Sequence, residues 1–309
     1  MLFQKVIDTF VIQLFMSLPK LLQVMYKQEI TRRHRTAFVI AIDQSQSMLD
    51  EVVFNGRKVS KATAVAEVTD NIINELILRA GREDGVRDYY DIALLGYSGE
   101  EVYPLLDPAR DFIPISEFCK YAPISSEVSV ERVLPDGRKN IHKEEVRHWI
   151  APRAEGDTPM YEAMLYIRDI VSAWCAKPQN ADSFPPVIFN ITDGECSDCN
   201  ERELLNVTEQ IRNISTSDGN VLLINIHLAS GNGTQSAIFP SDDEIDADNR
   251  GLKLLAECSS IMPEAFNELI RSHRGGLAIP PFRGISYNAS ITELITMLNI
   301  GSRSITNLI

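Results

Sequence analysis

The residues AFVIAI at positions 37–42 are followed directly by DQSQS at positions 43–47, and these eleven residues give the strongest indication of the fold. An uninterrupted apolar run of this length is typical of a β-strand buried on both faces of a parallel sheet. The run ends at the carboxylate of Asp43 and the hydroxyl groups of Ser45 and Ser47. Ligands of open α/β sheets bind just beyond the carboxyl ends of the strands. The stretch therefore predicts both a parallel sheet and a binding site at its edge.

Similar apolar runs recur further along the chain, at residues 92–97, 187–191 and 221–228. Amphipathic segments alternate with them and predict helices over residues 61–80, 158–176, 202–214, 252–258, 263–273 and 291–298. Such alternation is typical of a three-layer α/β/α sandwich. We therefore expect a Rossmann-like, mostly parallel sheet with helices on both faces.

The main domain is expected to span residues 37–300, with a short tail at 301–309. Residues 98–157 show no helical pattern and predict an antiparallel excursion inserted into the domain. Residues 128–133 alternate apolar and polar side chains, and the turn signal Pro-Asp-Gly follows at 135–137. This pattern predicts an inserted β-hairpin.

Residues 1–36 form a separate N-terminal amphipathic segment with apolar side chains at helical spacing. The segment has a net charge of +4, whereas the remainder of the chain has −17. Polar residues interrupt it too early for a membrane-spanning helix, and it lacks the cleavage site of a secretory signal. The helix can fold back on the acidic domain, bind a protein partner or lie on a membrane surface. We expect the first of these and favour the membrane surface least.

Composition restricts the class of protein. The 309 residues are 44% hydrophobic and 24% charged, as in soluble globular proteins, and the net charge of −13 argues against a nucleic-acid partner. An odd, sparse set of five cysteines predicts a reducing, cytoplasmic location. Cys196 and Cys199 form a C-x-x-C pair, which we expect to be unpaired thiols. The alternatives are a redox pair or half a zinc site, to which His227 and Cys258 could add the two further ligands. The acidic run at 241–249 is expected to be a solvated loop.

Two further loops offer oxygen atoms to the edge where Asp43 lies. Asp193 follows the apolar run that ends at 191, and Thr158 precedes Pro159 at the expected start of a helix. Three separate loops can thus contribute hydroxyl and carboxylate oxygens to one point. Oxygen donors of this kind suit Mg²⁺ or Mn²⁺.

The set Asp43-x-Ser45-x-Ser47, Thr158 and Asp193 resembles the metal-ion-dependent adhesion site of the von Willebrand factor A (VWA) family, which includes integrin I domains. The resemblance implies that Ser45 and Ser47 bind Mg²⁺ or Mn²⁺ directly and that Thr158 joins them when ligand is present. It also implies that Asp43 and Asp193 hold the ion directly or through water. An acidic side chain of a protein partner then completes the coordination.

The chain departs from the family pattern at Gln46 and Asp157, where glycine is common. Both side chains can narrow the choice of partner without removing a ligand oxygen. The compact layout is similar to that of bacterial cytosolic members, such as those of tellurium-resistance-type operons. The family setting implies a kinase, phosphatase or ATPase, encoded nearby, as the partner.

We therefore expect a non-catalytic, Mg²⁺-dependent protein-interaction module. One alternative is a metal-assisted phosphohydrolase that uses Asp43 as haloacid-dehalogenase-like enzymes do. Ser45 disfavours it, because those enzymes have a carboxylic acid there as the general acid. Another alternative is a scaffold that acts through its N-terminal helix and retains a vestigial metal site.

Overall fold

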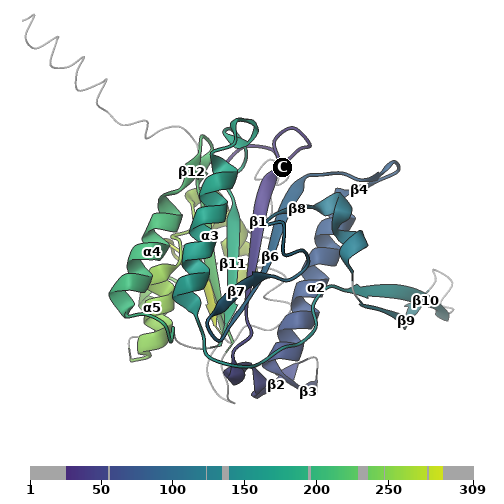
Figure 1. The fold of residues 1–309 in the computed structure, drawn as a ribbon, viewed down its shortest axis with the longest axis horizontal. Helices are drawn as coiled ribbons and strands as arrows, with labels where there is room; N and C mark the ends of the chain where they lie inside the picture. Colours follow the sequence, from purple (N-terminus) through teal and green to yellow (C-terminus); the bar gives the residue numbers. More distant parts are fainter. Residues whose placement is uncertain are drawn as a thin grey trace, which may run out of the picture.

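The computed structural model describes residues 26–54, 56–122, 124–133, 139–193, 196–228, 236–246, 248–276 and 278–287. An eight-stranded sheet forms its centre, in the order β15–β16–β14–β11–β1–β6–β7, with β8 also paired to β6 (Figure 1). The bounds of these strands are β1 (Thr36–Asp43), β6 (Tyr90–Ser98), β7 (Glu101–Pro104), β8 (Ile113–Pro114), β11 (Val187–Thr192), β14 (Leu222–His227), β15 (Ala237–Ile238) and β16 (Ile285–Tyr287). The strands from β16 to β6 are parallel, and the outer strands β15, β7 and β8 are antiparallel to their neighbours.

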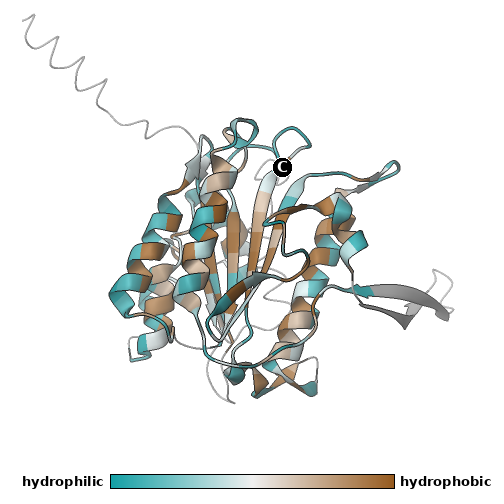
Figure 2. Cartoon of the chain, viewed as in Figure 1, coloured by the Kyte–Doolittle hydropathy of each residue, from teal (hydrophilic) through white to brown (hydrophobic). Residues whose placement is uncertain are grey.

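Helices cover both faces of this sheet. On one face lie α2 (Lys61–Ala80) and α6 (Asn267–Arg274), and on the other lie α3 (Met160–Cys175), α4 (Glu201–Asn213) and α5 (Arg250–Cys258) (Figure 1). Strand β1 shows why the sequence requires two layers: Phe38 and Ile40 pack in the core beneath α2, whereas Val39 packs in the core beneath α3. Hydrophobic residues accordingly concentrate in the central strands and on the inner helix faces (Figure 2).

The predicted three-layer sandwich with a mostly parallel sheet is confirmed for the described residues. The four apolar runs are β1, β6, β11 and β14, and the predicted helix over 61–80 is α2. The helix predicted from 158 begins two residues later, at Met160, with Pro159 as its N-cap residue. The helix predicted over 263–273 is a 3-10 turn followed by α6.

The inserted hairpin is confirmed as β9 (Ile124–Val133) paired antiparallel with β10 (Lys139–His148). The turn predicted at 135–137 lies outside the described residues. The carboxylate of Asp70 on α2 anchors the base of the hairpin, because it accepts a hydrogen bond from the backbone N of Trp149 at 2.8 Å and pairs with Nδ1 of His148 at 2.9 Å.

Shorter elements connect the main ones. They are β2 (Glu51–Phe54), β3 (Arg57–Ser60), β4 (Gly81–Arg82), β5 (Gly85–Val86), β12 (Ser215–Thr216), β13 (Gly219–Asn220), and the 3-10 turns η1 (Gln46–Leu49), η2 (Ile115–Tyr121), η3 (Pro178–Asn180), η4 (Asp242–Glu244) and η5 (Glu264–Phe266). The sequence patterns did not predict the hairpin β2–β3, which joins the loop after β1 to α2.

Several predictions fall outside the described residues: most of the N-terminal amphipathic helix, the helix at 291–298 and the tail at 301–309.

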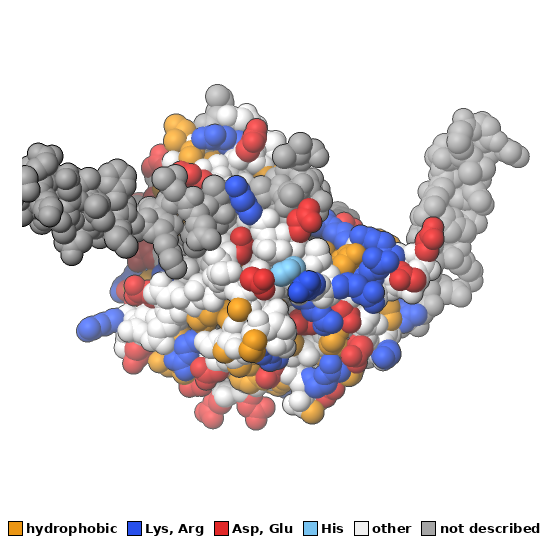
Figure 3. Space-filling model, turned by 90° about the horizontal axis from the view of Figure 1, so that it is seen from above, with side chains coloured by type: hydrophobic (Ala, Val, Ile, Leu, Met, Phe, Trp, Pro, Cys, Tyr) orange, Lys and Arg blue, Asp and Glu red, His pale blue; other side chains and the backbone are white. Residues whose placement is uncertain are grey.

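Within the described part of the chain, every helix is too short or too polar to cross a bilayer. Acidic and basic side chains are interspersed on the face seen in Figure 3, which looks onto the edge of the sheet opposite the predicted site.

Candidate metal site at the sheet edge

Asp43 lies at the end of β1 and is completely buried. Its Oδ1 accepts a hydrogen bond from the backbone N of Ser45 at 2.9 Å, and its Oδ2 accepts one from Oγ1 of Thr192 at 2.7 Å. Burial raises the pKa of Asp43, because desolvation disfavours the carboxylate, and the nearby Asp193 adds a smaller effect in the same direction. The two hydrogen bonds oppose this shift and fix the orientation of the carboxylate.

A continuous row of oxygen atoms runs from the first loop to Asp193. The Oγ atoms of Ser45 and Ser47 are 3.0 Å apart, and Oγ of Ser47 donates to Oδ1 of Asp193 at 2.7 Å. Neighbouring oxygens around Mg²⁺ are about 2.9 Å apart, because each lies about 2.0–2.1 Å from the ion in an octahedron. The spacing and the hard-oxygen chemistry of this row therefore fit Mg²⁺ or Mn²⁺. Ser45 is buried, whereas Ser47 is exposed, so the row opens to solvent at Ser47.

The loop carrying Thr158 is joined to the first loop through the backbone. The N–H of Gln46 donates to the carbonyl of Gly156, and the N–H of Glu155 donates to the carbonyl of Gln44, both at 2.8 Å. Gly156 has a φ of +71°, and a Cβ there would lie 2.8 Å from backbone atoms of Gly99. Glycine is therefore required at this position.

Thr158 is also joined to the loop after β11. Oγ of Ser197 accepts a hydrogen bond from the N–H of Thr158 and donates one to its carbonyl, each at 2.9 Å. The next residue, Asp198, caps the start of α3 by accepting hydrogen bonds from the N–H groups of Tyr161 and Glu162 at 3.0 Å. An acceptor from a distant loop thus satisfies the N-terminus of this helix, which begins two residues after Thr158.

All five predicted residues consequently lie at the end of a strand or in loops that meet at one edge of the sheet. Asp43, Ser45, Ser47 and Asp193 are connected by hydrogen bonds, and Thr158 is held beside them through its backbone. The structure does not test their binding of a metal, which stays a prediction.

Lys61 is a site residue that the sequence patterns missed. Its side chain is 2% exposed, and its Nζ lies 2.6 Å from Oδ2 of Asp193 and 3.3 Å from Oδ2 of Asp50. Lys61 is the first residue of α2, and the first turn of that helix contains no acidic residue. A cation at a helix N-terminus is unfavourable because of the helix dipole. That unfavourable placement is the signal that could have pointed to a carboxylate partner from elsewhere in the chain.

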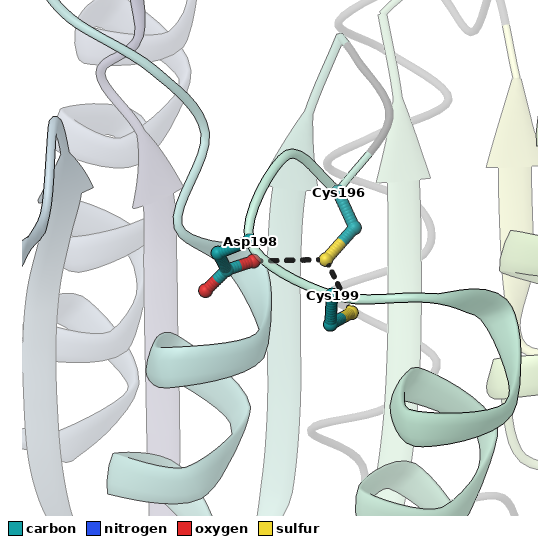
Figure 4. Close-up of side chains that lie close together, drawn as sticks. All are labelled: Cys196, Asp198 and Cys199. Atoms are coloured by element: carbon teal, nitrogen blue, oxygen red, sulfur yellow. Dashed lines mark hydrogen bonds between the residues drawn. The ribbon is translucent and has the colours of Figure 1, made fainter.

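The C-x-x-C pair lies in the same loop as Ser197 (Figure 4). The two Sγ atoms are 2.7 Å apart, and Sγ of Cys196 donates to Oδ1 of Asp198 at 2.9 Å. Both cysteines are free and partly buried. Among the described residues, Asp198 is the third donor grouped with the pair, and His227 and Cys258 are not part of this group.

The acidic run at 241–249 is exposed to solvent at most of its described positions, as predicted, and it also forms specific ion pairs. Asp242 forms an ion pair with Arg283 at 2.6 Å, and Glu244 forms one with Arg274 at 2.7 Å. Glu244 also completes a capping box with Ser241. The arginines come from distant positions, and the local sequence therefore could not reveal these pairs.

No protein-family model matches the chain, and no curated protein matches its sequence. Among solved structures, it is similar to the von Willebrand factor type A protein from Catenulispora acidiphila, with 14% identity, a TM-score of 0.37, and coverage of 63% of this chain but only 33% of that one. It is also similar to the vWF domain of the type V pili tip protein Mfa5 from Porphyromonas gingivalis, with 10% identity, a TM-score of 0.41, and coverage of 86% and 93%.

The PilB minor pilin from Streptococcus sanguinis gives 10% identity, a TM-score of 0.40, and coverage of 86% of this chain and 60% of that one. At such scores, no ligand or partner follows from these likenesses. The fold is established by the strand order and the two helical layers described above.

Proposed function

We propose that the chain is a non-catalytic VWA-type module that binds Mg²⁺ or Mn²⁺ at the sheet edge and captures an acidic side chain of a protein partner. The observation that supports this function is the row of oxygen atoms from Ser45 through Ser47 to Asp193, with separations of 3.0 and 2.7 Å. These separations suit adjacent positions around an octahedral ion.

Each residue has a definable part in this proposal. Ser45 and Ser47 supply neutral hydroxyl ligands, Thr158 joins them when the partner binds, and Asp43 and Asp193 supply the negative charge. A bound Mg²⁺ supplies a positive centre with an exchangeable coordination position. The exposed side of Ser47 gives a carboxylate from a partner access to that position.

The buried state of Asp43 argues against the phosphohydrolase alternative. Both of its carboxylate oxygens accept hydrogen bonds, and the residue is 0% exposed. A nucleophilic carboxylate must reach the phosphorus atom of its substrate, and the burial of Asp43 therefore disfavours this role. The scaffold alternative depends on the N-terminal segment, most of which lies outside the described residues.

The partner is proposed to be a protein that presents Asp or Glu, with a kinase, phosphatase or ATPase as the class that the family resemblance suggests. The cytoplasmic location and the lack of a nucleic-acid partner stay predictions from composition. Removal of the metal ion by a chelator distinguishes the binding module from the scaffold, because only the binding module needs the ion to capture its partner.

A double variant, Ser45→Ala with Ser47→Ala, tests the proposal. Mn²⁺ binding to the full chain is measured by electron paramagnetic resonance, and partner capture is measured from the native cell with Mg²⁺ or EDTA. We expect the double variant to lose Mn²⁺ binding and EDTA to abolish capture, while Ser172→Ala on the exposed face of α3 changes neither. Undiminished Mn²⁺ binding in a folded double variant would contradict the proposal.

A further inference from the structure

We propose that Lys61 is an internal counterion of Asp193 which an incoming divalent cation must displace toward Asp50, so that Lys61 sets the metal affinity of the site. This inference rests on the proposed metal-binding function. It assigns a positioning and affinity-setting role to a residue outside the set of predicted ligands.

The contacts of Lys61 place a charge next to a predicted ligand. The Asp193 side chain is 0% exposed and is shared between two donors, with Ser47 on Oδ1 and Lys61 on Oδ2 at 2.6 Å. A buried carboxylate is costly unless it is paired. The ammonium group of Lys61 therefore supplies the positive charge that a bound metal ion would otherwise supply to the carboxylate of Asp193.

A second acceptor lies within reach of the same ammonium group. Oδ2 of Asp50 is 3.3 Å from Nζ of Lys61, and the side chain of Asp50 is 59% exposed. The backbone beneath is fixed, because the N–H of Lys61 donates to the carbonyl of Asp50 at 2.9 Å and Ser60 caps α2. Lys61 can thus shift from the buried to the exposed carboxylate by side-chain movement alone.

The charge balance gives the direction of the effect. Asp43 and Asp193 together neutralise a divalent cation, and Asp50 balances the ammonium group of Lys61, so the cation and the ammonium group compete for the carboxylate of Asp193. Like charges a few ångströms apart repel strongly in a buried environment. Lys61 therefore weakens metal binding, because the cation must displace its ammonium group from Asp193.

The test is the affinity of the full-length protein for Mn²⁺, measured by electron paramagnetic resonance with thermal unfolding in EDTA as the check on folding. Lys61→Gln is expected to tighten Mn²⁺ binding about tenfold or more, because it removes a neighbouring charge. Asp50→Asn is expected to weaken Mn²⁺ binding several-fold, because it removes the carboxylate that would receive the displaced ammonium group of Lys61. The matched control is Lys58→Gln on β3, where Lys58 is 75% exposed and pairs with Glu51 at 3.7 Å.

The outcomes separate this inference from the proposed function. Tighter binding by Lys61→Gln supports the inference, including the case in which only this variant binds Mn²⁺. If the wild type binds Mn²⁺ and a folded Lys61→Gln binds it equally or more weakly, the inference is wrong but the metal site stands. If neither binds Mn²⁺, both are wrong. Should Lys61→Gln fail to fold, an unchanged affinity in Asp50→Asn overturns the inference.

Discussion

The hydroxyl group of Ser197 is hydrogen-bonded to both the N–H and the carbonyl of Thr158, each at 2.9 Å. Two loops separated by 39 residues are thereby held together at the predicted metal site. The backbone N–H of Ser197 also donates to the Thr158 carbonyl, at 3.1 Å. Ser197 therefore positions a predicted ligand without being one.

Replacing Ser197 with alanine is expected to weaken Mn²⁺ binding several-fold, because the loop that carries Thr158 loses two of its restraints. The free energy of unfolding should fall by about 1 kcal/mol, the usual contribution of such hydrogen bonds. Mn²⁺ titration and urea unfolding measure the two effects. Ser217→Ala, at an exposed position, is the control, and equal Mn²⁺ affinity in the two variants would contradict the positioning role.

A buried polar network crosses the sheet beneath the site. The hydroxyl of Tyr97 donates to Oδ1 of Asn190 at 2.9 Å, and Nδ2 of Asn190 donates to Oδ1 of Asn225 at 2.8 Å. Tyr97→Phe removes the hydroxyl that donates to the buried side-chain oxygen Oδ1 of Asn190. That oxygen then lacks this hydrogen bond, so the free energy of unfolding should fall by about 1–3 kcal/mol. Urea unfolding tests this loss. Tyr166→Phe, which loses an exposed bond to Asp111, should cost less, and the reverse order would contradict the prediction.

Asp70 is expected to hold the hairpin β9–β10 against α2. Asp70→Ala leaves the N–H of Trp149 and the ring of His148 without this carboxylate, and the free energy of unfolding should fall by about 2 kcal/mol. Limited proteolysis should then cleave β10 faster than in the wild type. Asp84→Ala, which removes only a weak surface pair with Arg87 at 3.4 Å, should leave the cleavage rate unchanged. Equal rates in the two variants would show that Asp70 is not the anchor.

The pair between Glu244 and Arg274 predicts a pH dependence of stability. The hydrogen bond from Arg274 lowers the pKa of Glu244 from 4.5 to about 2. A carboxyl group with a lowered pKa in the folded state stabilises the protein above its unfolded pKa, and this contribution is lost as the pH falls through the folded value. The stability difference between wild type and Glu244→Gln should therefore be constant above about pH 5 and shrink between about pH 4.5 and 2. Because the pair is partly exposed, the difference should be small. A pH-independent difference in urea unfolding would contradict the assignment.

The sheet and most of its helices could be predicted from the amino-acid sequence. Uninterrupted apolar runs such as 37–42 can be buried only between two layers, and the amphipathic pattern over 61–80 fixes one helix face toward the sheet. The sequence also placed Asp43, Ser45, Ser47 and Asp193 at one edge, because the carboxyl ends of parallel strands share an edge.

The charges and hydrogen bonds that surround these oxygens could not be predicted, because they depend on the tertiary structure. Lys61 lies 132 residues from Asp193, and Ser197 lies 39 residues from Thr158, so neither contact follows from local periodicity or spacing. Local patterns encode which face of an element is buried, whereas a contact between two polar side chains depends on how separate elements pack. Lys61 and Asp193 meet because the start of α2 lies beside the carboxyl end of β11, and a lysine thereby lies at the predicted metal site.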